Sequence, residues 1–130
     1  MTLEVASGLI ATLVAEAASA APHECCGILL GRGRIERALP AANRAADPAR
    51  QFEIDPQALI SAHRAAREGG LPVLGYYHSH PTGDPAPSAT DRAHSAGDGS
   101  VWAIVAGDAV AFWKDAPGGF QALSYAVGDG

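Results

Sequence analysis

Apolar residues in this chain come in short runs that end at glycine, proline or a charged residue, and this pattern limits the fold more than any other feature. The run CCGILLG at residues 25–31 is a clear example. Short apolar runs between turn residues are typical of buried β-strands. We therefore expect a sheet with short strands at residues 25–31, 35–39, 52–54, 72–78, 101–106, 109–113 and 120–127, with a tight turn at Gly107-Asp108.

Two segments have helical periodicity instead. Leu9, Leu13 and Ala17 recur at i, i+4 and i+8, one face of an amphipathic helix with Ser7 as its expected N-cap. A second helix is expected after the N-cap Asp55, with proline at its first position and the glycine pair 69–70 at its end. This order of elements predicts an α/β fold with a largely mixed sheet. The length of 130 residues predicts one domain, 1–130.

Composition excludes several classes of function. Nine Lys and Arg against fourteen Asp and Glu give a net charge of −5, which argues against a nucleic-acid partner. No apolar run approaches the roughly 18 residues of a membrane span. Residues 1–20 end in an A-x-A-like pattern, but they contain no Lys or Arg and have helical periodicity, so we expect a folded helix and not a signal peptide. The expected location is the cytoplasm.

The segment His78-Ser79-His80-Pro81, followed by a proline-rich loop and a short helix beginning at Ser88, carries the chemistry. Alternate residues of a strand share a face, so His78 and His80 present both imidazoles to one point. Asp91, in the first turn of the helix, brings a carboxylate to the same place. Two imidazoles and one carboxylate suit Zn²⁺ and leave a fourth position for a water nucleophile. Glu24 is the candidate general base for that water.

Each of these residues also has an ordinary interpretation. An H-x-H pair is common without a metal, Asp91 stands at the N3 position of a helix cap, and Glu24 alone suggests a solvated carboxylate. The joint spacing favours the metal site. Cys25 and Cys26 are adjacent, which disfavours a disulfide, and no basic group is placed to activate them, so we expect buried packing.

Other polar and aromatic residues have no assigned chemistry. Ser79 is expected to face away from the ligands and make a core hydrogen bond. His23, His63 and His94 are expected in exposed or capping roles. The two tryptophans, Trp102 and Trp113, are expected in the core, where one could border a substrate groove.

These segments together resemble a known family. Residues 22–31 (PHECCGILLG), then His78-Ser79-His80-Pro81, then residues 88–91 (SATD), are similar to the JAMM motif of the MPN+ (Mov34/PAD-1-like) metalloproteases, at every motif position. The resemblance implies a single-domain, cytidine-deaminase-like MPN/JAB1 fold with a curved mixed sheet flanked by helices. It also implies one zinc ion per chain and hydrolysis of peptide or isopeptide bonds. By position, His78, His80 and Asp91 would bind the zinc, Glu24 would be the general acid/base, and Ser88 would donate to the oxyanion.

The short chain resembles the compact prokaryotic members, which implies action on the C-terminal Gly-Gly tail of a small ubiquitin-like or sulfur-carrier protein. The five arginines among residues 32–50 could receive an acidic carrier or form a solvated strand edge. A zinc amidohydrolase of small amides and a non-catalytic MPN scaffold remain as alternatives. The sequence identifies neither the carrier, nor the released group, nor the oligomeric state.

Overall fold

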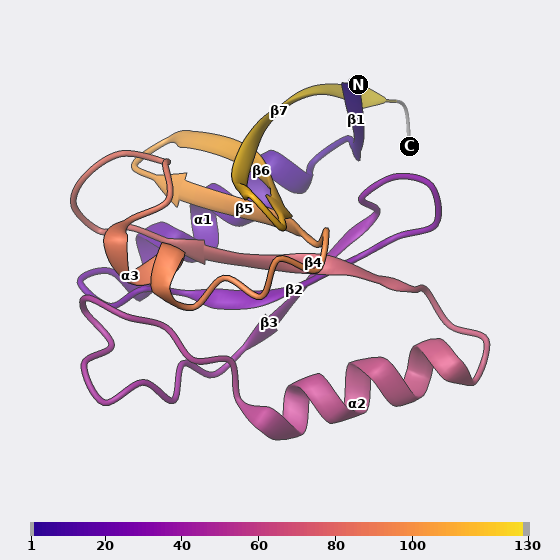
Figure 1. The fold of residues 1–130 in the computed structure, drawn as a ribbon, viewed down its shortest axis with the longest axis horizontal. Helices are drawn as coiled ribbons and strands as arrows, with labels where there is room; N and C mark the ends of the chain where they lie inside the picture. The colour runs from indigo at the N-terminus through magenta and orange to yellow at the C-terminus, as the bar shows by residue number, and fades with distance from the viewer. Residues whose placement is uncertain (1, 129–130) are drawn as a thin grey trace.

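The computed structural model describes residues 2–128, which are built around one seven-stranded sheet (Figure 1). The strands lie in the order β1-β7-β6-β5-β4-β2-β3. Their bounds are β1 Thr2–Ala6, β2 Cys26–Leu30, β3 Arg37–Ala41, β4 Val73–Ser79, β5 Val101–Ala106, β6 Ala109–Ala116 and β7 Gly119–Gly128. The helices within these residues are α1 Leu9–Ala20, α2 Pro56–Arg67 and α3 Ala89–Ala93.

The sheet is mixed. The pairs β4–β5 and β1–β7 are parallel, and the other four pairs are antiparallel. A parallel pair needs a crossover connection, and the chain between β4 and β5 supplies one that carries α3. β7 curves away from the central strands to meet β1 near the two ends of the chain (Figure 1). The expected α/β fold with a curved mixed sheet and flanking helices is confirmed.

Helices cover the two faces of the sheet and define two apolar cores. On the α1 side, Leu9 and Leu13 pack with Leu29 of β2 and Tyr77 of β4. On the α2 side, Ala62 packs with the alternate residues of the same two strands, among them Cys26, Ile28 and Tyr76. Successive strand residues point to opposite faces, so β2 and β4 contribute to both cores. His78 therefore lies on the α2 side of the sheet.

Glycine is needed where β4 approaches β5 closely. A Cβ atom built at Gly75 would collide with the carbonyl oxygen of Val101, its register partner on β5. No larger residue fits at that position without moving one of the two strands. This close approach keeps β4 paired with β5 three residues before His78.

Several expected boundaries hold. Asp55 accepts a hydrogen bond from the Gln57 amide at the start of α2, Pro56 is its first residue, and Gly69 follows its end with φ of 99°. β5 and β6 form the expected hairpin around the turn at residues 107–108. The expected single domain, 1–130, stays a prediction.

Three expectations about the elements are wrong, and one strand was not expected. α1 begins after Gly8, which has φ of 85° and no side-chain cap, so Ser7 is not the N-cap. Residues 52–54 form no strand, because Ile54 makes only a single bridge, to Asn43. The strand expected at 35–39 is β3, at 37–41, while Ile35 bridges Val5 instead. The edge strand β1 had no prediction, because its five residues lack a strong apolar pattern and pair with residues 124–128.

Helices of the described part are short. α1 and α2 have 12 residues each, and no helix among residues 2–128 has the length and apolar character needed to cross a membrane.

Candidate metal centre

His78 and His80 stand at the end of β4, where the strand leaves the sheet. His78 pairs in register with Cys26 on one side and Ile104 on the other, and is 1% exposed. The His80 amide donates to the carbonyl of Val105 at 2.7 Å, which keeps the backbone extended beyond the last residue of β4. The two Nε2 atoms lie 3.2 Å apart. Both imidazoles therefore meet at one point, as the spacing predicts.

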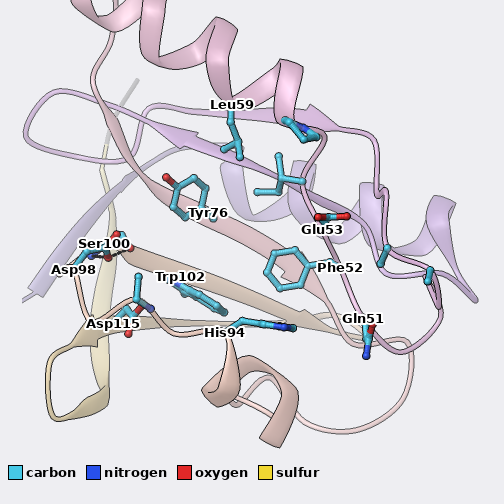
Figure 2. Close-up of a pocket in the computed structure, with 15 residues that line it drawn as sticks. Gln51, Phe52, Glu53, Leu59, Tyr76, His94, Asp98, Ser100, Trp102 and Asp115 are labelled. Carbon is cyan, nitrogen blue, oxygen red and sulfur yellow. Dashed lines mark hydrogen bonds between the residues drawn. The ribbon is translucent and has the colours of Figure 1, made fainter.

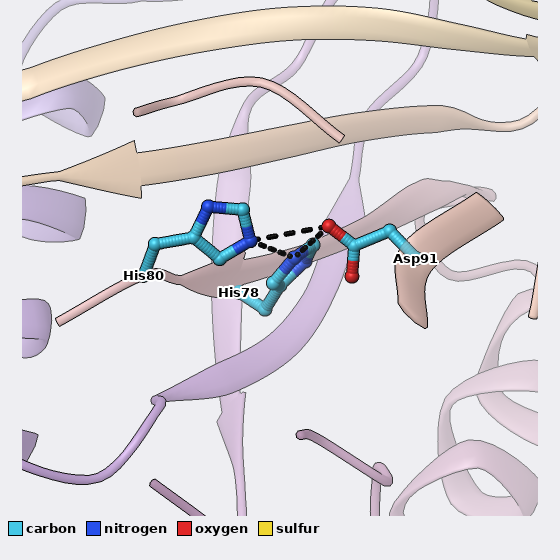
Figure 3. A group of neighbouring side chains, drawn as sticks. All are labelled: His78, His80 and Asp91. Carbon is cyan, nitrogen blue, oxygen red and sulfur yellow. Dashed lines mark hydrogen bonds and ion pairs between the residues drawn. The ribbon is translucent and has the colours of Figure 1, made fainter. Parts of the chain in front are cut away.

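Asp91 completes the group from α3. Its Oδ2 atom lies 3.1 Å from Nε2 of His78 and 3.1 Å from Nε2 of His80 (Figure 3). The same Oδ2 accepts from the Ser88 amide at 2.9 Å, while Ser88 Oγ accepts from the Asp91 amide at 3.1 Å, a reciprocal helix cap. Helix capping and the predicted ligand position are thus combined in one carboxylate.

The electrostatics of the three residues are strongly coupled. Burial lowers the pKa of His78. The hydrogen bond with Asp91 raises the pKa of His80, against the opposing effect of burial. Burial would raise the pKa of Asp91, but contact with the two histidines outweighs it and lowers that pKa well below its usual range. Asp91 is therefore an ionised carboxylate between the imidazoles.

The donor geometry fits a tetrahedral metal ion. Zinc ligands at about 2.0–2.1 Å from the ion stand roughly 3.3 Å apart on a tetrahedral face, close to the 3.1–3.2 Å edges here. His80 Nδ1 lies 2.7 Å from the Asp84 carbonyl, which only accepts, so Nδ1 carries the hydrogen and Nε2 of the neutral ring offers a lone pair. His78, His80 and Asp91 are a group that could hold a metal ion within the described part of the chain.

Glu24 lies just before β2 and is 6% exposed. Its amide donates to the Pro48 carbonyl at 2.7 Å, and its carbonyl accepts from Asn43 Nδ2 at 3.1 Å. Burial raises the pKa of its carboxyl to about 7, with the charge of His80 lowering it and that of Asp91 raising it further. Glu24 lines a cleft of about 540 Å³ beside the C-terminal end of α1. A carboxyl with a pKa near 7 is able both to accept and to return a proton at neutral pH.

The sequence assigns no role at the site to Phe52 or Asn43, and it places Trp102 only in the core, where it could border a substrate groove. Phe52 stacks on the His78 ring with centroids 4.2 Å apart, and Trp102 contacts the same ring edge-to-face at 5.7 Å. Asn43 organises the loop between β3 and α2. Its Nδ2 donates to the carbonyls of Glu24 and Gln51, and its Oδ1 accepts from the amides of Ala45 and Glu53. A single asparagine in an aperiodic loop is a weak signal, and Phe52 stood in an expected strand.

The remaining sequence candidates lie where their ordinary interpretations place them. Ser79 Oγ accepts from the Cys25 amide at 2.8 Å, the expected core hydrogen bond. His23, His63 and His94 are exposed and are not members of the His78–His80–Asp91 group. Both cysteines are free and buried, and burial raises the thiol pKa to about 11 for Cys25 and about 12 for Cys26.

The two tryptophans differ in their surroundings, and arginines of the stretch 32–50 form ion pairs. Trp102 is 6% exposed and borders a cavity, whereas Trp113 donates from Nε1 to the Pro85 carbonyl at 3.0 Å and so holds the proline-rich loop. In the arginine-rich stretch, Arg44 pairs with Asp55 at 3.6 Å and Arg50 with Asp47 at 4.0 Å, in exposed positions.

Curated relatives match about 70% of the chain. A desampylase of Haloferax volcanii is 40% identical over 95 residues, which cover 71% of this chain and 68% of that protein. A probable TtuB-protein conjugate cleaving protease of Thermus thermophilus is 37% identical over 91 residues, covering 70% of this chain and 62% of that protein. The matches thus span about two thirds of these relatives' lengths.

Solved structures share the fold. A protein of Desulfitobacterium hafniense superposes with a TM-score of 0.87 at 24% identity, covering 99% of this chain and 94% of that chain. A JAB1/MPN domain protein from Archaeoglobus fulgidus has a TM-score of 0.62 at 20% identity, over 96% and 97% of the two chains. Residues 6–116 match the family model for prokaryotic homologs of the JAB domain. This chain therefore belongs to the prokaryotic JAB family.

Proposed function

We propose that this chain is a zinc-dependent hydrolase that cleaves a peptide or isopeptide bond at the C-terminal Gly-Gly tail of a small ubiquitin-like or sulfur-carrier protein. The observation that carries the proposal is the triangle of His78 Nε2, His80 Nε2 and Asp91 Oδ2, with edges of 3.1–3.2 Å, next to a buried carboxyl. The relatives named desampylase and TtuB-protein conjugate cleaving protease support the substrate class.

The three residues of the triangle would hold the metal ion. His80 is oriented by its Nδ1–H contact with the Asp84 carbonyl, and Asp91 by the helix cap with Ser88. Zinc bound there supplies a Lewis acid that lowers the pKa of a water molecule to about 7 and polarises the scissile carbonyl. Three protein ligands leave a position for that water, as in catalytic zinc sites.

Glu24 moves the proton. Its carboxylate accepts a proton from the attacking water and returns it to the nitrogen of the leaving amine. A pKa of about 7 suits both steps, since neither protonation state is strongly favoured at neutral pH. The Pro48 carbonyl accepts from the Glu24 amide and Asn43 Nδ2 donates to the Glu24 carbonyl, so both peptide units that flank the Glu24 side chain are held in place.

Ser88 stabilises the developing oxyanion. Its Oγ accepts from the Asp91 amide, so the hydroxyl hydrogen is available to donate to the substrate carbonyl oxygen. One such donor is typically worth about 3 kcal/mol of transition-state stabilisation. The same residue thus caps α3, which carries a metal ligand, and donates to the substrate.

The free cysteines support a proposal for the cellular setting. Cys25 and Cys26 are free and buried, which fits a reducing compartment, and we place the enzyme in the cytoplasm. Residues of the site come from the chain between 24 and 91, from segments packed around the ends of β2 and β4 and from α3, and this supports action as a single domain.

The test separates metal binding from proton transfer. Zinc affinity, measured by equilibrium dialysis, is expected to be lost in the His78→Ala/His80→Ala double variant and retained in Glu24→Gln. A carrier joined through its Gly-Gly tail to a lysine side chain should be cleaved by the native protein and by Glu68→Gln, an exposed control, and by neither site variant.

Four results would count against the proposal. Unchanged zinc affinity in the double variant removes the metal site. Undiminished cleavage by Glu24→Gln removes Glu24 from the mechanism. Cleavage of short amides with no gain from an intact carrier indicates a small-amide hydrolase, and zinc binding without hydrolysis of either substrate indicates a scaffold.

A further inference from the structure

A cavity of about 640 Å³ lies beside the metal centre, and no step of the proposed hydrolysis uses it. Its walls come from the loop before α2, from β4 and from the chain around the start of β5 (Figure 2). Phe52 and Trp102 both line the cavity and both contact the ring of His78. One layer of aromatic rings therefore lies between the cavity and His78, which places the cavity directly beside the candidate metal centre.

The lining combines an aromatic floor with carboxylates. Phe52, Tyr76 and Trp102 supply the rings. Carboxylates come from Glu53, Asp98 and Asp115, while the lining contains no lysine or arginine. Asp98 accepts from both the amide and the hydroxyl of Ser100, and these hydrogen bonds lower its pKa and keep it ionised. An aromatic surface bordered by ionised carboxylates is complementary to a long side chain with a positive end.

The position of Glu24 indicates which part of a substrate reaches this cavity. Glu24 lines a separate cleft of about 540 Å³, which shares no lining residue with the aromatic cavity. The leaving amine must receive its proton from Glu24, so it lies on the Glu24 side. The acyl side of the scissile bond then extends toward the aromatic cavity. A Gly-Gly tail has no side chain near the bond, so the first side chain able to fill the cavity belongs to a residue further up the tail.

We propose that this cavity is a specificity site that binds a lysine or arginine side chain of the carrier tail, upstream of its Gly-Gly end. The aliphatic stem lies against Phe52, Tyr76 and Trp102, and the cationic end reaches Asp98 or Glu53. The inference rests on the proposed function, because it takes the carrier tail as the substrate. The volume of the cavity lies within the range of about 300–1,000 Å³ found for sites that bind small molecules.

The experiment uses the zinc-loaded protein and a set of fluorogenic isopeptides that end in Gly-Gly joined to a lysine side chain. The three residues before Gly-Gly are varied one at a time to arginine, alanine or glutamate. At one of these positions kcat/KM is expected to be about tenfold higher for arginine than for glutamate. This ratio should fall toward one in Asp98→Asn and in Glu53→Gln/Asp98→Asn, and stay unchanged in Asp108→Asn, an exposed turn control.

A second measurement keeps the inference independent of hydrolysis. Affinity of the labelled, uncleaved isopeptides is measured by fluorescence anisotropy in zinc-loaded Glu24→Gln. Tighter binding of the arginine isopeptide, abolished when Asp98→Asn is added, supports the site even if no isopeptide is cleaved, in which case only the proposed function fails. Equal kcat/KM and equal affinity for arginine and glutamate isopeptides, or an arginine preference that survives Glu53→Gln/Asp98→Asn, would overturn the inference.

Discussion

Cys25 and Ser79 are joined by two hydrogen bonds that run in opposite directions. The Cys25 amide donates to Ser79 Oγ at 2.8 Å, and the Ser79 amide donates to the Cys25 carbonyl at 3.1 Å. Cys25 directly follows Glu24, and Ser79 stands between His78 and His80. This pair therefore ties the candidate base to the strand end that carries two candidate ligands, although the two segments lie more than 50 residues apart.

Replacing Ser79 by alanine should destabilise the protein and slow hydrolysis. The buried Cys25 amide loses its acceptor, which costs about 1–3 kcal/mol. Glu24 then loses a fixed neighbour, while the ring nitrogens of His78 and His80 keep theirs, so kcat falls and zinc affinity is retained. Urea unfolding and single-turnover kinetics measure the two effects. Ser61→Ala, on the exposed side of α2, should change the unfolding free energy by less than about 0.5 kcal/mol. An unchanged unfolding free energy for Ser79→Ala would contradict the role of this hydrogen bond.

Asn43→Ala should have a larger effect, because one side chain holds both Glu24 and the loop that carries Phe52. The substitution removes donors at 3.1 and 3.0 Å to the carbonyls of Glu24 and Gln51, and acceptors at 3.0 and 3.1 Å for two amides. At about 1 kcal/mol for each of these four hydrogen bonds, we expect a loss of roughly 4 kcal/mol in urea unfolding. Hydrolysis should fall at least tenfold with zinc affinity unchanged.

The matched control for Asn43 is Gln57→Ala. The side-chain amide of Gln57 donates to the hydroxyl of Ser61, an exposed serine on the same helix. The Gln57→Ala variant should hydrolyse the substrate as fast as the native protein. Full activity of Asn43→Ala would show that Glu24 does not depend on this contact.

The metal-free protein should become less stable, relative to Glu24→Gln, as the pH rises from about 4.5 to about 7. Burial raises the pKa of Glu24 from 4.5 to about 7, so the folded state binds a proton that the unfolded state has released. Stability linked to this proton is present below pH 4.5 and lost as the pH passes 7, a difference of up to about 3 kcal/mol. Urea titrations of both proteins with a chelator, between pH 4 and 8, measure it. Parallel stability curves for the two proteins would contradict the raised pKa.

Both cysteines should resist alkylation in the folded protein. Burial raises the pKa of the Cys25 thiol to about 11, and Cys25 is 6% exposed, so little thiolate is present or accessible at pH 8. Iodoacetamide is expected to modify neither cysteine within the time that it takes to modify both in urea, and to leave hydrolysis unchanged. Rapid labelling of the folded protein with loss of activity would favour a thiol nucleophile.

Much of the site was predictable because its determinants are local. His78 and His80 share a face through the two-residue period of a strand, and Asp55 and Pro56 mark a helix start by chemistry confined to a few residues. Ser88 and Asp91 likewise form a cap within one helical turn. The joint spacing of these pieces favours a metal site, and the resemblance to the JAMM motif added the role of Ser88.

Other features were not predictable because their partners are distant in sequence. β1 exists only through its pairing with the other end of the chain and with Ile35. Phe52 has the apolar character of a strand residue, but its neighbour Ile54 finds a single bridge, so the segment becomes a cavity wall instead. Gly8 precedes α1 in a left-handed conformation where a serine cap was expected.

By itself the sequence determined the kinds of elements and the donor atoms of the candidate metal centre, because backbone periodicity and capping act over a few residues. Only the tertiary structure decided that Oδ2 of Asp91 serves the helix cap and meets both imidazoles at 3.1 Å. It also decided that Glu24 is buried enough to have a pKa near 7 and that it opens into a different cleft from the aromatic cavity. Burial and the meeting of separate segments depend on how the whole sheet packs, and no local pattern encodes them.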